Sequence, residues 1–178
     1  MYAKYESLLG ICAPRQFYEI GGAFFFAVEI WLFTVSSNMN FKILDKNRKE
    51  EVAGLFTSVF SSAEGEKEGR LIGSLAAELS ANIDNEEIIC FGAYEEKSMV
   101  GSIFFTRLRF DVPILVYMLA PVAVSTEHQA KGVGQALINF GLNELKNRSV
   151  AIAVTYGDPS FYAKAGFQPL PESVSGRR

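Results

Sequence analysis

The sequence predicts a single α/β domain, on three observations. Segments with helical spacing of apolar residues alternate along the chain with short apolar runs typical of strands. The chain has 178 residues, enough for one domain with a core of its own. A glycine-containing loop lies between an apolar run and a helix within residues 122–142, an arrangement that favours an anion site at the helix N-terminus.

From residue 39 onward the expected order is β, α, α, three β, α, β, α, β. Residues 41–44 alternate like a short strand, and Asp45 is suited to cap a helix over residues 47–60. Residues 61–69 are polar and punctuated by glycine, which indicates a solvated loop. The next segment, 70–82, returns to helical spacing through the apolar positions Leu71, Leu75 and Leu79.

Three strand-like runs follow, at residues 87–95, 99–110 and 114–124. The first two are separated by a hairpin-length turn. The third contains Pro121, whose nitrogen carries no hydrogen to donate to a sheet. We therefore expect a bulge or an unpaired strand face at Pro121.

The last third of the chain alternates helices and strands. A helix is expected over residues 132–148, a buried strand over 150–157, and an extended piece over 167–170. Between the last two lies a short helix, 158–166, with Pro159 in its first turn.

The N-terminal segment differs from the rest. Residues 21–37 are densely apolar, but Glu29 interrupts them and they fall short of the ~20 residues of a spanning helix. Three interpretations stay open: a translated upstream segment with the true start at Met39, which we favour, a weakly inserted membrane anchor, or an extra packed helix. The predicted division is an atypical apolar extension, 1–38, followed by the domain, 39–178.

Composition narrows the function classes. The net charge of -3 argues against a nucleic-acid-binding surface. Cys12 and Cys90 are far apart and His128 is the one histidine, so no metal site is expected. Without a disulfide framework, a cytoplasmic location is expected. His128 itself is interpreted as an exposed residue at the start of the helix, and Cys90 as a buried one.

The glycine loop reads QAKGVG at residues 129–134. It lacks the GxxxxGK[ST] of a P-loop and the third glycine of a dinucleotide-binding fingerprint. It does match the signature [QR]xxGx[GA] of the GCN5-related N-acetyltransferases (GNAT). The segment TYGDPSFYAKAGFQPL, residues 155–170, also resembles that family, with its Tyr-x-x-x-Gly-Phe ending. The resemblance covers residues 39–170 and implies the GNAT fold, a mixed central sheet flanked by helices.

The resemblance implies acetyl-CoA as cosubstrate. Gln129 opens the signature, and in the family the backbone amides of the loop hold the pyrophosphate. The pantetheine arm pairs, like an extra strand, with the strand that ends at the loop. Carried over to this chain, the cofactor-binding residues are Val122, Ala123, Val124, Gln129, Lys131, Gly132, Val133, Gly134 and Gln135.

The implied reaction is acetyl transfer to a primary amine of a small molecule or protein, by direct attack on the thioester. Tyr162 matches the family's proton donor to the leaving thiolate, although an aromatic here could serve only the core. No base is marked: Glu127 and Asp158 are candidates, but Asp158 is first of all suited to cap the short helix. The acceptor is not encoded in any motif.

The chain also departs from the family pattern. After the Gly-Phe corner it is too short for the usual final strand pair, so a truncated C-terminal strand is expected. The alternative function is therefore a non-catalytic acyl-CoA-binding module with an incomplete acceptor site. A membrane-tethered enzyme is a second alternative, with membrane contact only if the N-terminal extension is genuine, and a homodimer is left open.

Overall fold

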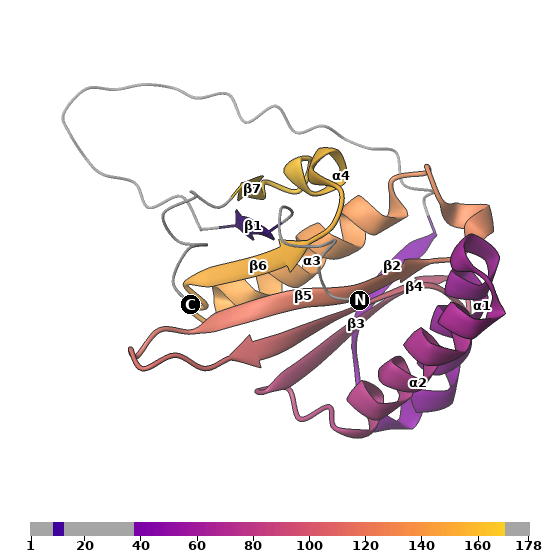
Figure 1. Ribbon diagram of the computed structural model, residues 1–178, viewed down its shortest axis with the longest axis horizontal. Helices are drawn as coiled ribbons and strands as arrows, with labels where there is room; N and C mark the ends of the chain where they lie inside the picture. The colour runs from indigo at the N-terminus through magenta and orange to yellow at the C-terminus, as the bar shows by residue number, and fades with distance from the viewer. Residues whose placement is uncertain (1–8, 13–37, 170–178) are drawn as a thin grey trace.

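A computed structural model describes residues 9–12 and 38–169 (Figure 1). The strands form one sheet in the order β2-β3-β4-β5-β6-β1-β7. They are β1 (Leu9–Cys12), β2 (Met39–Leu44), β3 (Ile88–Glu95), β4 (Ser98–Leu108), β5 (Val116–Val124), β6 (Ile152–Tyr156) and β7 (Gln168–Pro169). The helices are η1 (Lys46–Arg48), α1 (Lys49–Glu64), α2 (Glu66–Ala81), η2 (Thr126–His128), α3 (Val133–Asn147) and α4 (Pro159–Ala163).

This order confirms the elements predicted from residue 39 onward. The sheet is mixed, because β5 and β6 are parallel whereas the other paired strands are antiparallel. Asp45 accepts a hydrogen bond from the Asn47 N–H at 2.9 Å and so caps the turn that leads into α1. Pro159 lies in the first turn of α4, as expected.

The sheet separates two hydrophobic clusters. Along β3 and β4 the side chains alternate, so that Phe91 and Phe105 face α3 while Cys90 and Phe104 face α1 and α2. Figure 1 shows α1 and α2 together on one side of the sheet and α3 on the other. Cys90 is fully buried, as its apolar neighbourhood in the sequence indicates.

The prediction of a loop at residues 61–69 is wrong. Helix α1 continues to Glu64, Gly65 turns the chain with a φ of +94°, and α2 begins at once. Of the three leucines with helical spacing in α2, Leu79 packs against the core, whereas Leu71 and Leu75 are exposed. Glycines take the face of α2 toward α1 because the helices approach too closely for larger side chains, and the buried residues of α2 are Gly69, Gly73, Ala76 and Ser80.

The bulge predicted at Pro121 is confirmed. Ile103 of β4 pairs with Val122, but Phe105 pairs with Leu119, so β5 holds one more residue than β4 between these pairs. The parallel pairing of β5 with β6 reaches its last pair at Leu119 and Thr155. Residues 122–124 of β5 therefore have a strand partner on the β4 side and none on the β6 side within the described parts of the chain.

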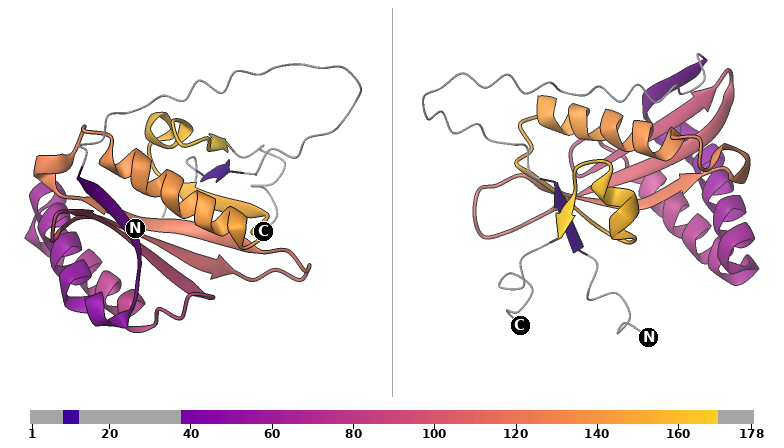
Figure 2. Two further views of the ribbon diagram at one scale, coloured as in Figure 1. Left: turned by 180° about the vertical axis from the view of Figure 1, so that it is seen from behind. Right: turned by 90° about the horizontal axis from the view of Figure 1, so that it is seen from above.

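Strand β1 joins the sheet from the N-terminal segment, where the sequence patterns predict no strand. It runs antiparallel to β6, from Leu9 opposite Tyr156 to Cys12 opposite Ala153, and Ile11 is also opposite Gln168 of β7 (Figure 2). Strand β7 thus connects to the sheet through β1.

Two expectations lie outside the described residues. The interpretations of residues 21–37 fall there, and so does the truncated strand expected after the Gly-Phe corner, beyond residue 169. Within residues 9–12 and 38–169, no helix combines the length and hydropathy needed to cross a membrane.

The close contact of α1 and α2 predicts that Gly69→Ala is destabilising. A Cβ at Gly69 would lie 2.6 Å from the Ser61 backbone nitrogen, so the helices must separate. We expect a loss of about 1–3 kcal/mol, measured by denaturant unfolding. Gly54→Ala is the matched control, because no atom lies within 4 Å of its added Cβ, and it should leave stability equal or higher. Equal stabilities of the two variants would contradict the packing described here.

Candidate functional site

A cavity of about 480 Å³ lies between β5, the N-terminus of α3, and α4. Most residues predicted to bind the cofactor line it, together with the predicted proton donor. They are Val122, Val124, Gln129, Gly132, Val133, Gly134, Gln135 and Tyr162. The other lining residues were not predicted to bind the cofactor; they are Val59, His128, Ala130, Phe161 and Lys164.

The first turn of α3 presents free N–H groups to this cavity. Gly132 is the N-cap, with the positive φ of +80° that glycine adopts without strain, and no side chain caps the helix there. The first intrahelical bond is donated by Ala136 to the Gly132 carbonyl, at 3.0 Å. The N–H groups of residues 133–135 therefore lie at the positive end of the helix dipole, where an anion is favoured.

The loop before α3 is fastened to the end of β5. The Gln129 side-chain amide donates to the Val124 carbonyl at 3.0 Å. Lys131 is exposed and does not line the cavity. The side chain of Ala123 also lies elsewhere, buried on the α1 and α2 side of the sheet, because successive strand residues face opposite sides. Ala123 and Lys131 can thus contribute only through the backbone or through long-range charge.

Tyr162 lies at the cavity wall and also packs into the core. Its ring makes edge contacts with Phe161 and Phe167, at centroid distances of 5.0 and 5.7 Å. Gly157 provides the space, since a Cβ there would lie 2.8 Å from the Tyr162 ring. Burial raises the pKa of Tyr162 above its ordinary value, and the Thr155 hydroxyl offsets part of that rise. The phenol consequently stays protonated at neutral pH.

Thr155 is a residue that sequence reasoning missed. It is almost fully buried, and its hydroxyl donates to the Leu119 carbonyl at 3.0 Å, at the last pair of β5 and β6. The signal in the sequence was a hydroxyl residue inside an apolar strand, which needs a hydrogen-bond partner when buried.

The expectation that His128 is exposed is wrong, because its side chain is only 15% exposed. Its Nδ1 lies 2.6 Å from the Ser125 Oγ and its Nε2 lies 3.0 Å from the Glu95 Oε2. The contact with Glu95, the last residue of β3, ties the segment after β5 to the hairpin of β3 and β4. Glu95 is 33 positions away in the sequence, so local patterns could not reveal the contact.

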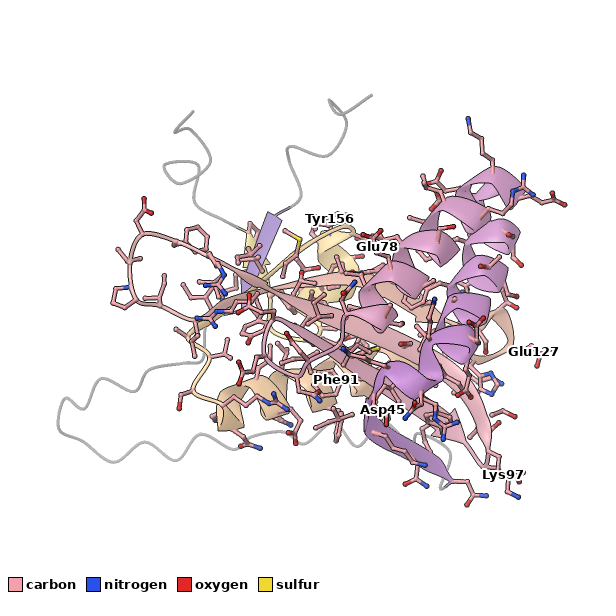
Figure 3. The ribbon with its side chains drawn as sticks, turned by 90° about the horizontal axis from the view of Figure 1, so that it is seen from below. Asp45, Glu78, Phe91, Lys97, Glu127 and Tyr156 are labelled. Atoms are coloured by element: carbon pink, nitrogen blue, oxygen red, sulfur yellow. The ribbon has the colours of Figure 1, made fainter. Side chains whose placement is uncertain are left out.

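The two candidate bases lie outside the cavity lining. Asp158 accepts from the Ser160 N–H at 2.8 Å, which confirms it as the cap of α4, and the bond from the Ser160 hydroxyl lowers the pKa of Asp158. Glu127 is exposed on the outer side of the loop (Figure 3). It lines a second, neighbouring cavity of about 430 Å³.

Known proteins are similar to this chain in sequence and in fold. Residues 86–169 match the acetyltransferase (GNAT) domain family. The uncharacterized N-acetyltransferase YjhQ of Escherichia coli K12 is 33% identical over 136 residues, which span 74% of this chain and 71% of YjhQ. A GNAT family acetyltransferase from Brucella melitensis, solved in complex with acetyl-CoA, aligns with a TM-score of 0.59 and 25% identity over 74% of this chain and 86% of that one. A GCN5-related N-acetyltransferase from Ralstonia eutropha JMP134 aligns with a TM-score of 0.61 and 19% identity, over 74% and 94%.

The chain therefore belongs to the GNAT family of acetyltransferases, and acetyl-CoA is its cosubstrate. The fold predicted from the QAKGVG signature is confirmed. The described residues suit the cofactor, because the site combines an unpaired strand face, a cavity, and a helix N-terminus free of side-chain caps.

Gly134→Val is expected to weaken acetyl-CoA binding at least tenfold. Even a Cβ at Gly134 would lie 3.3 Å from Phe161 and 3.4 Å from Val124, so valine branches must push into the cavity. Binding is measured by calorimetry, with Gly54→Val as the control for glycine replacement in an open helical position. Unchanged affinity in folded Gly134→Val protein would contradict cofactor binding at this turn.

Proposed function

We propose that this protein transfers the acetyl group of acetyl-CoA to a primary amine of a small molecule or a protein, by direct attack of the amine. The observation that carries the proposal is the separation of β5 from β6 beyond Leu119, with the cavity and Tyr162 at the same place. A strand that lacks a neighbour offers backbone groups to an extended ligand, and a buried phenol offers a proton.

The position of each residue supports the proposed cofactor-binding roles. Backbone amides of residues 131–135 would hold the pyrophosphate, aided by the helix dipole and by the space that Gly132 and Gly134 leave. Backbone groups of Val122, Ala123 and Val124 would pair with the pantetheine arm. Gln129 would act mainly by bracing the loop through its bond to Val124.

Acetyl-CoA supplies an activated thioester, at which the amine nitrogen forms its bond to the carbonyl carbon as the carbon–sulfur bond breaks. A backbone N–H within residues 122–124 would donate to the carbonyl oxygen as negative charge develops on it. Tyr162 would protonate the departing thiolate, a role that suits a phenol kept neutral by burial. The proton released by the amine is assigned to no particular side chain of the described residues.

This role predicts the behaviour of Tyr162→Phe. We expect kcat to fall by about 10²–10⁴-fold while acetyl-CoA affinity is unchanged, because only the proton donor is lost. Tyr94→Phe is the matched control: its hydroxyl donates to Glu51 at 3.1 Å, away from the cavity, and kcat should be unaffected. Equal kcat in wild type and Tyr162→Phe would remove Tyr162 from the mechanism.

Protonation of Tyr162 also sets a pH dependence. Its folded pKa lies above the unfolded value, so the protonated form and its contribution to stability are complete below the unfolded pKa, near 10. Both are lost as pH rises through the higher folded pKa. We expect wild-type kcat to hold up to alkaline pH and to decline beyond the ordinary tyrosine pKa, with no such decline in the residual rate of Tyr162→Phe.

The proposal is tested in two stages. Thermal unfolding of the full chain is measured with acetyl-CoA, and with NAD as a nucleotide control; ligand at 100 times its Kd should stabilise by about 2.7 kcal/mol. Release of free CoA is then followed against a panel of amines. Binding with turnover supports an enzyme, whereas binding without release above the hydrolysis rate for any amine indicates a non-catalytic acyl-CoA-binding module. A folded protein that does not respond to acetyl-CoA would refute both.

We also propose that residues 39–178 form the acetyltransferase domain and that the protein acts in the cytoplasm. The first rests on the run of elements from β2 to β7, to whose sheet β1 adds one strand from the N-terminal segment, and the second on the lack of a disulfide framework in the sequence. Cell fractionation of the full chain tests the location, and recovery in the membrane pellet would contradict it.

A further inference from the structure

Gln135 carries a buried polar atom that the protein leaves without a partner. The residue lines the cavity and is only 8% exposed. Its Nε2 donates to the Phe161 carbonyl of α4 at 2.7 Å. Its Oε1 is buried and accepts no hydrogen bond from the described residues. A buried acceptor that stays unsatisfied lowers stability, so such an atom on a residue that lines a cavity points to a missing donor.

The Phe161 carbonyl determines the orientation of the Gln135 side-chain amide. The Phe161 carbonyl can only accept, so the NH₂ group of Gln135 must face it and the oxygen must point elsewhere. Gln135 is also the third residue of α3, where a glutamine commonly turns back to accept from the N-cap N–H. Here the side chain bonds to α4 instead, so the Gln135 oxygen makes no capping bond to the Gly132 N–H.

The Gln135 oxygen needs a hydrogen-bond donor, and this requirement limits which part of acetyl-CoA can contact it. Phosphate oxygens at neutral pH accept hydrogen bonds and would repel the Gln135 oxygen. The pantetheine arm, in contrast, carries a hydroxyl and two amide N–H groups, all donors, and the hydroxyl is close to the pyrophosphate in the cofactor. The adenosine half also has donors, but they lie beyond the pyrophosphate from the arm.

We propose that the Gln135 side chain recognises the pantetheine arm, with Oε1 accepting from its hydroxyl or an amide N–H while Nε2 holds α4. This rests on the proposed function, in that it takes acetyl-CoA to bind in this cavity. Helix α4 carries Tyr162, so one side chain then contacts both the cofactor arm and the helix that bears the proton donor.

The test compares CoA with 3′-phospho-ADP, which has the nucleotide and pyrophosphate but no arm. Calorimetry gives both affinities for wild type, Gln135→Met and Gln135→Lys, and the readout is the ratio of CoA affinity to 3′-phospho-ADP affinity. Methionine removes the donor and the acceptor. Lysine keeps a donor for Phe161 but no acceptor. Because the terminal phosphate of 3′-phospho-ADP carries more negative charge than the pyrophosphate of CoA, affinities for this variant are compared at high salt, which screens that difference. We expect each variant to lower the ratio by about 5- to 10-fold, which corresponds to the net free energy of one lost hydrogen bond.

Three outcomes would overturn the inference. An unchanged ratio in both variants excludes a contact with the arm, including the case in which both ligands weaken equally through an adenosine contact. A ratio that falls in Gln135→Met but not in Gln135→Lys assigns the effect to the Phe161 bond alone. A similar fall in Gln168→Met, an exposed glutamine of β7, would make the effect unspecific. Wild-type protein that binds neither ligand refutes the proposed function itself, which is a distinct result.

Discussion

The site depends on the change of register in β5 opposite Phe104. One extra residue near Pro121 lets β5 keep its hydrogen bonds to β4 while it extends beyond the parallel pairing with β6. The Thr155 hydroxyl bonds to the Leu119 carbonyl at the last pair and holds the two strands together up to that point. The unpaired face of residues 122–124 lies just beyond that pair, so the location of the cavity follows from this one irregularity.

Aromatic packing places the start of α3 beside that face. Phe91 contacts Phe105 and Phe140 edge to face, at 5.9 and 5.6 Å, and joins the sheet to the helix (Figure 3). Gly141 allows the close approach, because a Cβ there would lie 2.6 Å from the Phe105 ring. A rigid helix fixed along its length holds its free N-terminal amides in a constant position, which is what preorganised anion binding needs.

The remaining wall of the cavity is the short helix α4, which is too brief to be stable alone. Asp158 caps it, Gln135 bonds to the carbonyl of its Phe161, and the Tyr162 ring packs on Phe167 beyond its end. The chain then enters β7, which reaches the sheet through β1. The predicted proton donor is thus positioned by contacts from separate parts of the chain.

Local patterns in the sequence determined the order of the elements from residue 39, the glycine loop and its family signature, the caps at Asp45 and Asp158, and the irregularity at Pro121. Each depends on residues within a few positions of one another, where spacing and backbone preference act directly. Tertiary structure alone decided that His128 contacts Glu95, that Thr155 contacts Leu119, that glycines rather than leucines pack α2 on α1, and that β1 lies between β6 and β7. These contacts join residues whose proximity depends on strand register and helix separation, and neither quantity is encoded in any single stretch of sequence.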